Sequence, residues 1–193
     1  MPSRYEIRLA GSGGQGLILA GIILAEAAGV YDGKFVCQTQ SYGPEARGGA
    51  SKAEVVISDG EIDYPKAIRP DVLLALNQKS LEAFSSDMKP GGLVLVDADL
   101  VHEAPASRVL ALPFTRIARE LGRPMVANIV ALGALAQLTG AVSLESLTAA
   151  VLARVPRGTE ELNRQALAAG VNAAKAAGPV SLPEDGGEKF EAL

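Results

Sequence analysis

The segment LAGSGGQGLILAG, residues 9–21, decides how the chain begins to fold. Residues 5–10 alternate in character, which predicts a β-strand, and the apolar residues after the segment's glycines predict a helix buried on all sides. Between the two, Gly11, Gly13 and Gly16 have the spacing that turns a strand tightly into a helix and lets the pyrophosphate of a dinucleotide approach the backbone. The first unit is therefore a strand, a glycine turn and a helix.

Dinucleotide binding needs more than this turn. It requires an acidic residue at the end of the second strand, about twenty residues further on, to bind the ribose hydroxyls. We expect Gly29 to close the helix and the second strand, Gly33–Thr39, to end in Gln38 and Thr39 rather than in an acid. Asp32 precedes that strand and so faces the opposite end of the sheet. NAD or FAD binding is thus disfavoured, and two alternatives stay open: a phosphate-binding turn, or a turn that only packs the helix on the sheet.

The rest of the chain predicts an α/β sheet. The segment Gln40–Ala50 is too short for a packed crossover helix, so the second strand and the third, Lys52–Ser58, are expected to be neighbours, with antiparallel pairing as an option. Further strands are predicted at 71–76, 93–97 and 108–113, and helices at 78–87, 114–121, 126–140, 143–155 and 159–177. We predict an α/β fold, a Rossmann-like three-layer sandwich with a mostly parallel, mixed sheet.

Composition limits the number of domains and the classes of partner. A chain of 193 residues, 48% of them hydrophobic, supports one core. We predict one domain at 1–178 and a flexible tail at 179–193, where Pro, Gly and acidic residues lack periodicity. The net charge of −4 argues against nucleic acid, and no apolar run reaches the length of a membrane span. Cys37, the single cysteine, cannot form an internal disulfide or hold an iron–sulfur cluster alone, and it fits a reducing cytoplasm.

The helix predicted at 126–140 is apolar on every side. Such a helix is buried either at the centre of the monomer or against another subunit. A homodimer of the isolated chain is therefore one of two open alternatives.

The loop SYGPEARGG, residues 41–49, is the second unusual segment. It offers one guanidinium, one carboxylate and one phenol, from Arg47, Glu45 and Tyr42. At the carboxyl edge of an open α/β sheet, such a loop lies where ligands or partner chains dock. The alternative is a solvated surface loop built around a turn at Pro44.

The chain shows no catalytic machinery of its own. His102 has no second His or Cys with which to form a metal site, so we predict no metal. Asp97 and Asp99 follow a strand as turn residues commonly do. No Ser, Cys or Lys stands in a recognisable nucleophile motif, and we predict no catalytic residue.

Taken in order, the motifs GSGGQG, SYGPEARGG, DVLLALN, KPGG and ANIVALGAL resemble the γ subunit of 2-oxoacid:ferredoxin oxidoreductases. This group includes the enzymes that oxidise pyruvate, 2-oxoglutarate, branched-chain ketoacids and indolepyruvate. The resemblance spans residues 5 to 175. It implies an enzyme that converts a 2-oxoacid and CoA to acyl-CoA, CO2 and reduced ferredoxin.

The resemblance also implies a division of labour. Thiamine diphosphate is held by α and β partners, and the iron–sulfur clusters are held by β or by a ferredoxin-like chain, an optional δ subunit. Mg also belongs to the holoenzyme, and the γ chain completes the assembly without binding a cofactor alone. Contacts to a phosphate or to CoA are expected from Gly11, Gly13, Gly14, Gln15 and Gly16. Contacts to partner subunits are expected from Ser41, Tyr42, Gly43, Pro44, Glu45, Arg47, Gly48, Gly49 and Asn128. The alternative function is a free-standing nucleotide-binding module or an NAD(P)-dependent dehydrogenase.

Overall fold

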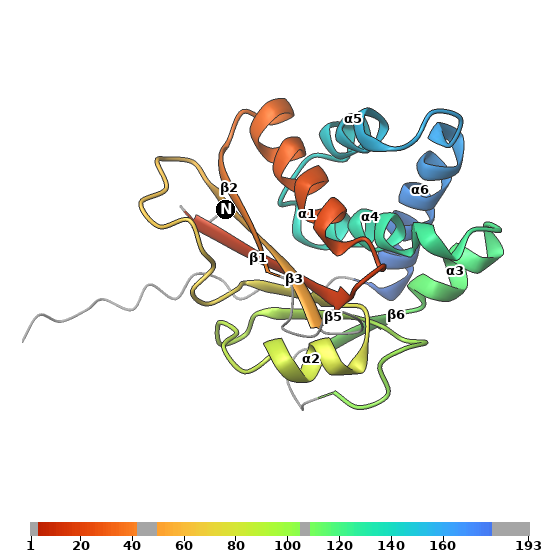
Figure 1. The fold of residues 1–193 in the computed structure, drawn as a ribbon, viewed down its shortest axis with the longest axis horizontal. Coiled ribbons are helices and arrows are strands. Elements are labelled where there is room, and N and C mark those ends of the chain that lie inside the picture. Colours follow the sequence, from red (N-terminus) through yellow and green to blue (C-terminus); the bar gives the residue numbers. More distant parts are fainter. Residues whose placement is uncertain (1–3, 42–49, 105–108, 179–193) are drawn as a thin grey trace, which may run out of the picture.

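A six-stranded sheet lies between helices in the computed structural model, which describes residues 4–41, 50–104 and 109–178 (Figure 1). The strands are β1 (Arg4–Ser12), β2 (Phe35–Ser41), β3 (Ala50–Ser58), β4 (Val72–Ala75), β5 (Leu93–Asp97) and β6 (Val109–Leu112), in the spatial order β2-β3-β1-β4-β5-β6. The pairs β1/β4, β4/β5 and β5/β6 are parallel, whereas β3 runs antiparallel to both β1 and β2. The mixed, mostly parallel sheet and the antiparallel pairing of the second and third strands are thereby confirmed.

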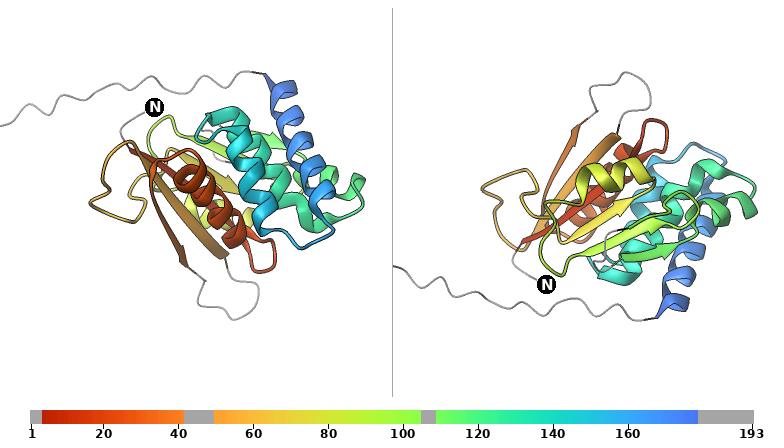
Figure 2. Two further views of the ribbon diagram at one scale, coloured as in Figure 1. Left: turned by 90° about the horizontal axis from the view of Figure 1, so that it is seen from above. Right: turned by 90° about the horizontal axis from the view of Figure 1, so that it is seen from below.

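Helices cover the two faces unequally (Figure 2). One face carries α1 (Leu17–Glu26) with its π-helical extension η1 (Ala27–Tyr31), α4 (Ala127–Thr139), α5 (Leu144–Arg154) and α6 (Glu160–Ala177). On this side α3 (Phe114–Glu120) and the short 3-10 turn η2 (Pro124–Val126) lead into α4. Among the helices of the described residues, α2 (Gln78–Phe84) alone covers the other face. The three predicted layers are present, and the predicted tail at 179–193 lies outside the described residues.

The apolar helix α4 is central to the monomer. Residues 128–136 and Thr139 are all buried within this one chain, so another subunit is not needed to cover them. Close contact with α6 makes this possible: a Cβ atom at Gly170 would lie 1.9 Å from the carbonyl oxygen of Val130, and one at Gly133 would lie 2.3 Å from that of Leu167. The backbones of α4 and α6 are therefore in contact at Gly133 and Gly170, because glycine has only a hydrogen atom as its side chain.

The prediction that Gly29 closes the first helix is wrong. The helix continues through Gly29 as η1 and reaches Tyr31. A Cβ at Gly29 would lie 2.5 Å from Cγ1 of Val36 on β2, so this glycine allows helix and strand to approach closely. The chain leaves the helix after Asp32, at Gly33, where φ is +68°.

Charged side chains are buried on the face that α2 covers. Arg8 on β1 is 2% exposed, and its guanidinium donates to Glu54 on β3, 2.8 Å away, and to both carboxylate oxygens of Asp87 after α2. Lys52 donates to the same Glu54 carboxylate, and both cations lie over the ring of Phe84. Because buried charges must be paired, this network fixes how α2 sits on the sheet.

Asp32 binds the start of α5. Its carboxylate accepts hydrogen bonds from the backbone N–H of Ser143, the N-cap residue, and from the hydroxyls of Ser143 and Ser146. Partial burial by itself raises the pKa of Asp32, but these hydrogen bonds outweigh it and hold the pKa below its ordinary value. Asp32 thus faces the amino end of the sheet, as predicted, and serves a helix there.

We expect Gly170→Ala to lower the free energy of unfolding by about 1–3 kcal/mol, because the methyl group would press on the Val130 carbonyl. Urea titration of both chains measures the difference. Asn172→Ala, on the exposed side of the same helix, is the control and should stay within about 0.5 kcal/mol of the wild type. Equal stability of Gly170→Ala and wild type would contradict the close contact.

Asp32→Asn should cost about 1–2 kcal/mol at pH 7, because the amide is a weaker acceptor at the start of α5. The folded-state pKa of Asp32 is lowered, so the carboxylate stabilises the fold above its unfolded pKa of about 3.9, and this contribution is lost as the pH falls through the lower, folded-state value. Urea titrations from pH 7 down to pH 3 should therefore show the two proteins converging in acid. A constant difference across this range would rule out the carboxylate as its source.

Candidate functional site

The glycine turn and the strand ends that flank the predicted docking loop lie at one edge of the sheet. Ser12, the last residue of β1, pairs with Ala50, the first residue of β3, and Ser41 at the end of β2 pairs with Lys52. Both ends of the loop at 42–49 therefore lie at the edge from which the turn emerges. Tyr42, Gly43, Pro44, Glu45, Arg47, Gly48 and Gly49 themselves lie outside the described residues.

The side chain of Gln15 holds the turn in place. Its Oε1 accepts hydrogen bonds from the backbone N–H of Ser12 at 2.7 Å and from Nδ2 of Asn77 at 2.9 Å. Its Nε2 donates to the carbonyl of Leu76 at 3.1 Å. Asn77 also caps α2 through Ser80. One amide thus ties the ends of β1 and β4 together, so the role of Gln15 inside the chain is to shape the turn.

The structural requirement for glycine differs among the glycine positions of the turn. Gly14 and Gly16 have positive φ values of +94° and +71°, which other residues rarely adopt. A Cβ at Gly11 would lie 2.6 Å from Oε1 of Gln15. Gly13 differs: it is exposed, is absent from the positive-φ residues, and a Cβ there would meet no atom of the described residues within 4 Å. Neither backbone conformation nor space among the described residues therefore requires glycine at this position, and its part in the turn stays a prediction.

Asn128 supports the turn from α4. It is 5% exposed, and its Nδ2 donates to the carbonyl of Gly16 at 3.1 Å. A Cβ at Gly16 would lie 2.5 Å from that nitrogen, so the contact requires glycine. The amide is thus engaged within the chain, and a contact of Asn128 with a partner subunit stays a prediction.

The first turn of α1 is open to an anion. Gly16 is its N-cap residue, no side chain caps the helix, and its first turn carries no acidic residue. The free N–H groups and the positive end of the helix dipole favour a negative charge at this point. Turn and helix therefore present backbone donors beside the exposed Gly13.

A polar hollow of about 290 Å³ lies at the same edge, on the face of the sheet that α2 partly covers. It is lined by Thr39, Gln40, Ser41, Lys52, Glu54 and Lys66. Glu54 is neutralised by Arg8 and Lys52, so Lys66 adds a net positive charge. Ser41, predicted as a contact residue, lies on this exposed rim.

The other titratable candidates serve the fold. Asp97 at the end of β5 is fully buried and accepts hydrogen bonds from the backbone N–H groups of Asp99 and Thr115 and from the Thr115 hydroxyl. Burial raises its pKa although these hydrogen bonds oppose the rise. His102 is exposed, and its backbone N–H donates to Gln78. Within residues 4–41, 50–104 and 109–178, no three His, Cys, Asp or Glu side chains gather as a metal site needs.

The strand order gives no support to dinucleotide binding. In that fold the second strand lies beside the first, so that its terminal acid reaches the ribose. Here β3 lies between β1 and β2, and β2 ends in Gln40 and Ser41. The described part of the chain also has no helix long and apolar enough to span a membrane.

Comparison with known proteins identifies the protein family to which this chain belongs. The family described as pyruvate ferredoxin/flavodoxin oxidoreductase matches residues 6–173. The 2-oxoglutarate synthase subunit KorC of Methanocaldococcus jannaschii is 56% identical over 177 residues, which cover 89% of this chain and 95% of the relative. The crystal structure of the gamma subunit of a keto/oxoacid ferredoxin oxidoreductase from Geobacter sulfurreducens superposes with a TM-score of 0.82 at 52% identity, over 90% of this chain and 98% of that one.

The chain therefore belongs to the pyruvate ferredoxin/flavodoxin oxidoreductase family. Within the family it is a gamma subunit of a 2-oxoacid:ferredoxin oxidoreductase, which confirms the resemblance found in its motifs. A third relative, the ketoisovalerate oxidoreductase subunit VorA of Methanothermobacter thermautotrophicus, is 41% identical over 134 residues, which are 69% of this chain but only 28% of the relative. In VorA the matching region is one part of a longer chain.

We expect Gly16→Ala to destabilise the chain by about 2 kcal/mol or more, because the residue has a positive φ and the new methyl group would displace Asn128. Gly13→Ala should change stability by less than about 0.5 kcal/mol, since its Cβ enters open space. Thermal and urea unfolding of the two variants gives the comparison. A loss of stability in Gly13→Ala equal to that in Gly16→Ala would show that the turn needs both glycines for folding.

Proposed function

We propose that the edge formed by the glycine turn receives the phosphates of CoA in an assembled 2-oxoacid:ferredoxin oxidoreductase. The observation that carries this proposal is Gly13, an exposed glycine whose Cβ would meet no atom of the described residues, so that the described part of the fold does not require its identity. A glycine that is not needed for folding suits a position where a ligand must approach the backbone. The uncapped first turn of α1 supplies N–H donors beside it.

Positive side chains near this edge support an anionic ligand. Lys66 lines the hollow beside Ser41 and supplies its net positive charge, because Lys52 is paired with Glu54. Arg47 belongs to the loop whose ends reach the same edge. A guanidinium offers five donors in a planar fork, which matches a phosphate or a carboxylate. Arg47 is therefore proposed to contact the CoA phosphates or a partner's carboxylate.

We propose that α and β companion subunits complete the enzyme, with a ferredoxin-like δ subunit as an optional fourth chain. The VorA relative supports companion chains, because its matching region is fused to a larger remainder of the same subunit. In our proposal these chains hold thiamine diphosphate, Mg and the iron–sulfur clusters, which supply decarboxylation and electron transfer. The gamma chain contributes the CoA edge and completes an assembly that works in the cytoplasm.

For the substrate we propose 2-oxoglutarate. This choice rests on the KorC relative, a 2-oxoglutarate synthase subunit that is 56% identical and nearly equal in length. The holoenzyme tests it directly: kcat/KM for 2-oxoglutarate should exceed the values for pyruvate and ketoisovalerate. A preference for either of the other acids would overturn the substrate but not the family.

The purified chain alone should not reduce viologen dyes with any 2-oxoacid, because in our proposal the companion chains hold the groups that supply decarboxylation and electron transfer. Addition of the α and β companions should restore turnover. The measurement is dye reduction with the chain, the companions and the mixture compared at equal concentration. Robust turnover by the chain alone, free of other subunits, would refute an accessory role.

Gly13→Val and Arg47→Ala should each raise the holoenzyme's KM for CoA by about tenfold, which corresponds to about 1.4 kcal/mol of lost binding, and leave the chain's melting temperature unchanged. Arg47→Lys should recover only part of the loss, since a point charge cannot replace the fork. Gly60→Val is the matched control, because Gly60 is also exposed beside open space but lies at the other end of β3. Wild-type KM values for both test variants would refute the proposed CoA edge.

A further inference from the structure

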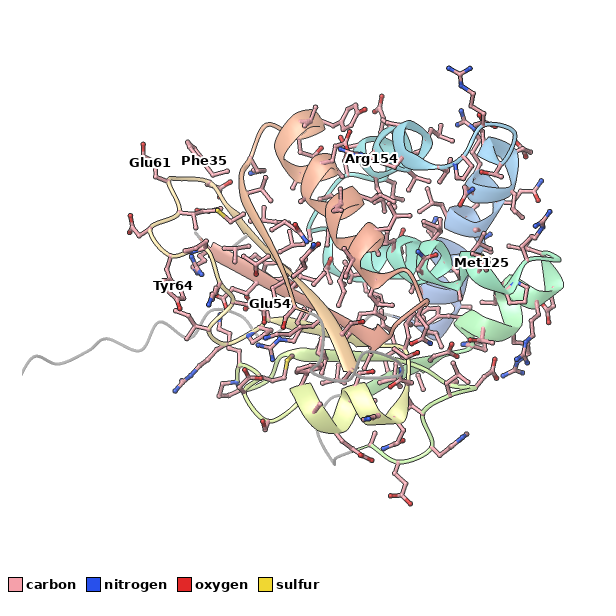
Figure 3. The ribbon with its side chains drawn as sticks, in the orientation of Figure 1. Phe35, Glu54, Glu61, Tyr64, Met125 and Arg154 are labelled. Carbon is pink, nitrogen blue, oxygen red and sulfur yellow. The ribbon has the colours of Figure 1, made fainter. Side chains whose placement is uncertain are left out.

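The register of two antiparallel strands builds the hollow beside Ser41. Thr39 on β2 pairs with Glu54 on β3, and Ser41 pairs with Lys52. Paired residues point to the same side of a sheet, and so do residues two positions apart along one strand. Two hydroxyls, a carboxylate and an ammonium group therefore share one face, the α2 side on which Glu54 lies (Figure 3). All four residues line the hollow of about 290 Å³.

The charges at this hollow do not cancel. Lys52 donates to Oε1 of Glu54 at 2.7 Å, and Arg8 donates to the same oxygen at 2.8 Å. Arg8 is also paired with Asp87, so these two cations and two carboxylates balance one another. Lys66 is the remaining cation, because within the described part of the chain its ammonium group forms no hydrogen bond or ion pair. The hollow therefore has one uncompensated positive charge.

Backbone contacts hold Lys66 over this face. Glu6 on β1 is 6% exposed, and its Oε2 accepts hydrogen bonds from the backbone N–H groups of Ile68 at 2.7 Å and Arg69 at 2.9 Å. Arg4 donates to the carbonyl oxygen of Lys66 at 2.8 Å. A buried carboxylate and a guanidinium thus fix the loop that carries this lysine. The loop is held without the use of the lysine side chain, which is left to contact a ligand.

The groups in the hollow match a phosphate monoester beside a sugar hydroxyl. A phosphate monoester carries about 1.5–2 negative charges at pH 7 and has three strong acceptor oxygens. The ammonium group of Lys66 and the hydroxyls of Thr39 and Ser41 can donate to such oxygens. Both hydrogen bonds to Glu54 use Oε1, so among the described residues its Oε2 is left to accept from a hydroxyl. A nucleotide ribose that carries a phosphate presents both features.

We propose that this hollow binds the 3′-phosphate of CoA. Lys66, Thr39 and Ser41 donate to the phosphate, and Glu54 accepts a hydrogen bond from the neighbouring ribose hydroxyl. This inference rests on the proposed function, since it adds a second phosphate subsite for the ligand that we assign to the glycine turn. Lys66 is then the residue that distinguishes CoA from a ligand without the 3′-phosphate.

The register places the hollow near the turn. Lys52 pairs with Ala10, two residues before Ser12, at which β1 ends. At about 3.4 Å per residue, the hollow begins about 7 Å along the strand from the turn. In CoA, a single ribose separates the pyrophosphate from the 3′-phosphate. The ligand would pass over the strand ends, with its pyrophosphate at Gly13 and its 3′-phosphate on the α2 side of the sheet.

The test compares CoA with dephospho-CoA, which lacks only the 3′-phosphate, in equilibrium binding to the assembled enzyme. The wild type should bind CoA about tenfold more tightly, as expected for one charge-assisted contact. Lys66→Met should lose this preference, because its affinity for CoA falls while its affinity for dephospho-CoA stays at the wild-type value. Lys66→Arg keeps the charge and should retain most of the preference. Lys175→Met, at an exposed position of α6, is the matched control and should bind both ligands like the wild type.

The outcomes separate the two proposals. If the wild type binds CoA and dephospho-CoA equally, or if Lys66→Met weakens both ligands or neither, the 3′-phosphate subsite is refuted. Gly13→Val should weaken both ligands by the same factor, and this result would support the glycine turn whatever Lys66→Met does. If Gly13→Val binds both like the wild type while Lys66→Met loses the preference, the hollow is supported and the turn is refuted. If the assembled enzyme binds neither ligand, both proposals fail.

Discussion

The arrangement of this chain depends on the pairing of β3 with β1 along their whole length, from Arg4 opposite Ser58 to Ser12 opposite Ala50. In a dinucleotide-binding sheet the second strand would occupy the position that β3 takes. The insertion of β3 moves β2 to the outside and places the end of β2 and the start of β3 beside the glycine turn. One antiparallel ladder therefore removes the ribose-binding geometry and brings these strand ends to the edge where the turn lies.

The helical layer follows from a different constraint, the scarcity of large side chains. Aromatic residues make up 4% of the chain, so the volume of the core is filled by aliphatic side chains and by backbone. Gly133 and Gly170 let α4 and α6 meet at backbone distance, and Gly29 does the same for η1 and β2. The close approach of the helix backbones fills the space that large side chains would otherwise fill. This close packing explains why α4 is buried without a second subunit.

Much of this was predictable from sequence because the signals are local. Apolar runs predicted β4 and β5, the glycine turn predicted the start of α1, and the short link after Gln40 predicted neighbouring strands. The features that could not be predicted from sequence also have physical explanations. Gly29 resembled a helix end, whereas its contact with Val36 is long-range and leaves no mark in a helical pattern. The pairing of the buried Arg8 and Glu54 with the half-exposed Asp87 could not be predicted, since each residue taken alone resembles a solvated charge.

The same distinction applies to the candidate site. The motif identified Gly11, Gly13 and Gly16 as a group, but only coordinates separate Gly11 and Gly16, which the fold requires, from Gly13, which it does not. Gln15 and Asn128 were expected to contact ligand or partner, and the structure shows both amides bonded to the turn itself. The motif selected this edge as the candidate site, which stays a prediction, whereas the contacts of Gln15 and Asn128 within the chain could be assigned only from the structure.

The position of β1 has a consequence for the newly made chain. Synthesis delivers this strand first, yet its two partners are β3 and β4, which end at Ser58 and Ala75. At about 5–20 residues per second, β1 waits several seconds on the ribosome before its second ladder can form. Until β3 has been made, Ile7 and Leu9, which are wholly buried in the finished fold, have no sheet to join. The β2–β3 pair is complete before β4 emerges, so the order of translation favours a three-stranded antiparallel nucleus, onto which the parallel half of the sheet is added.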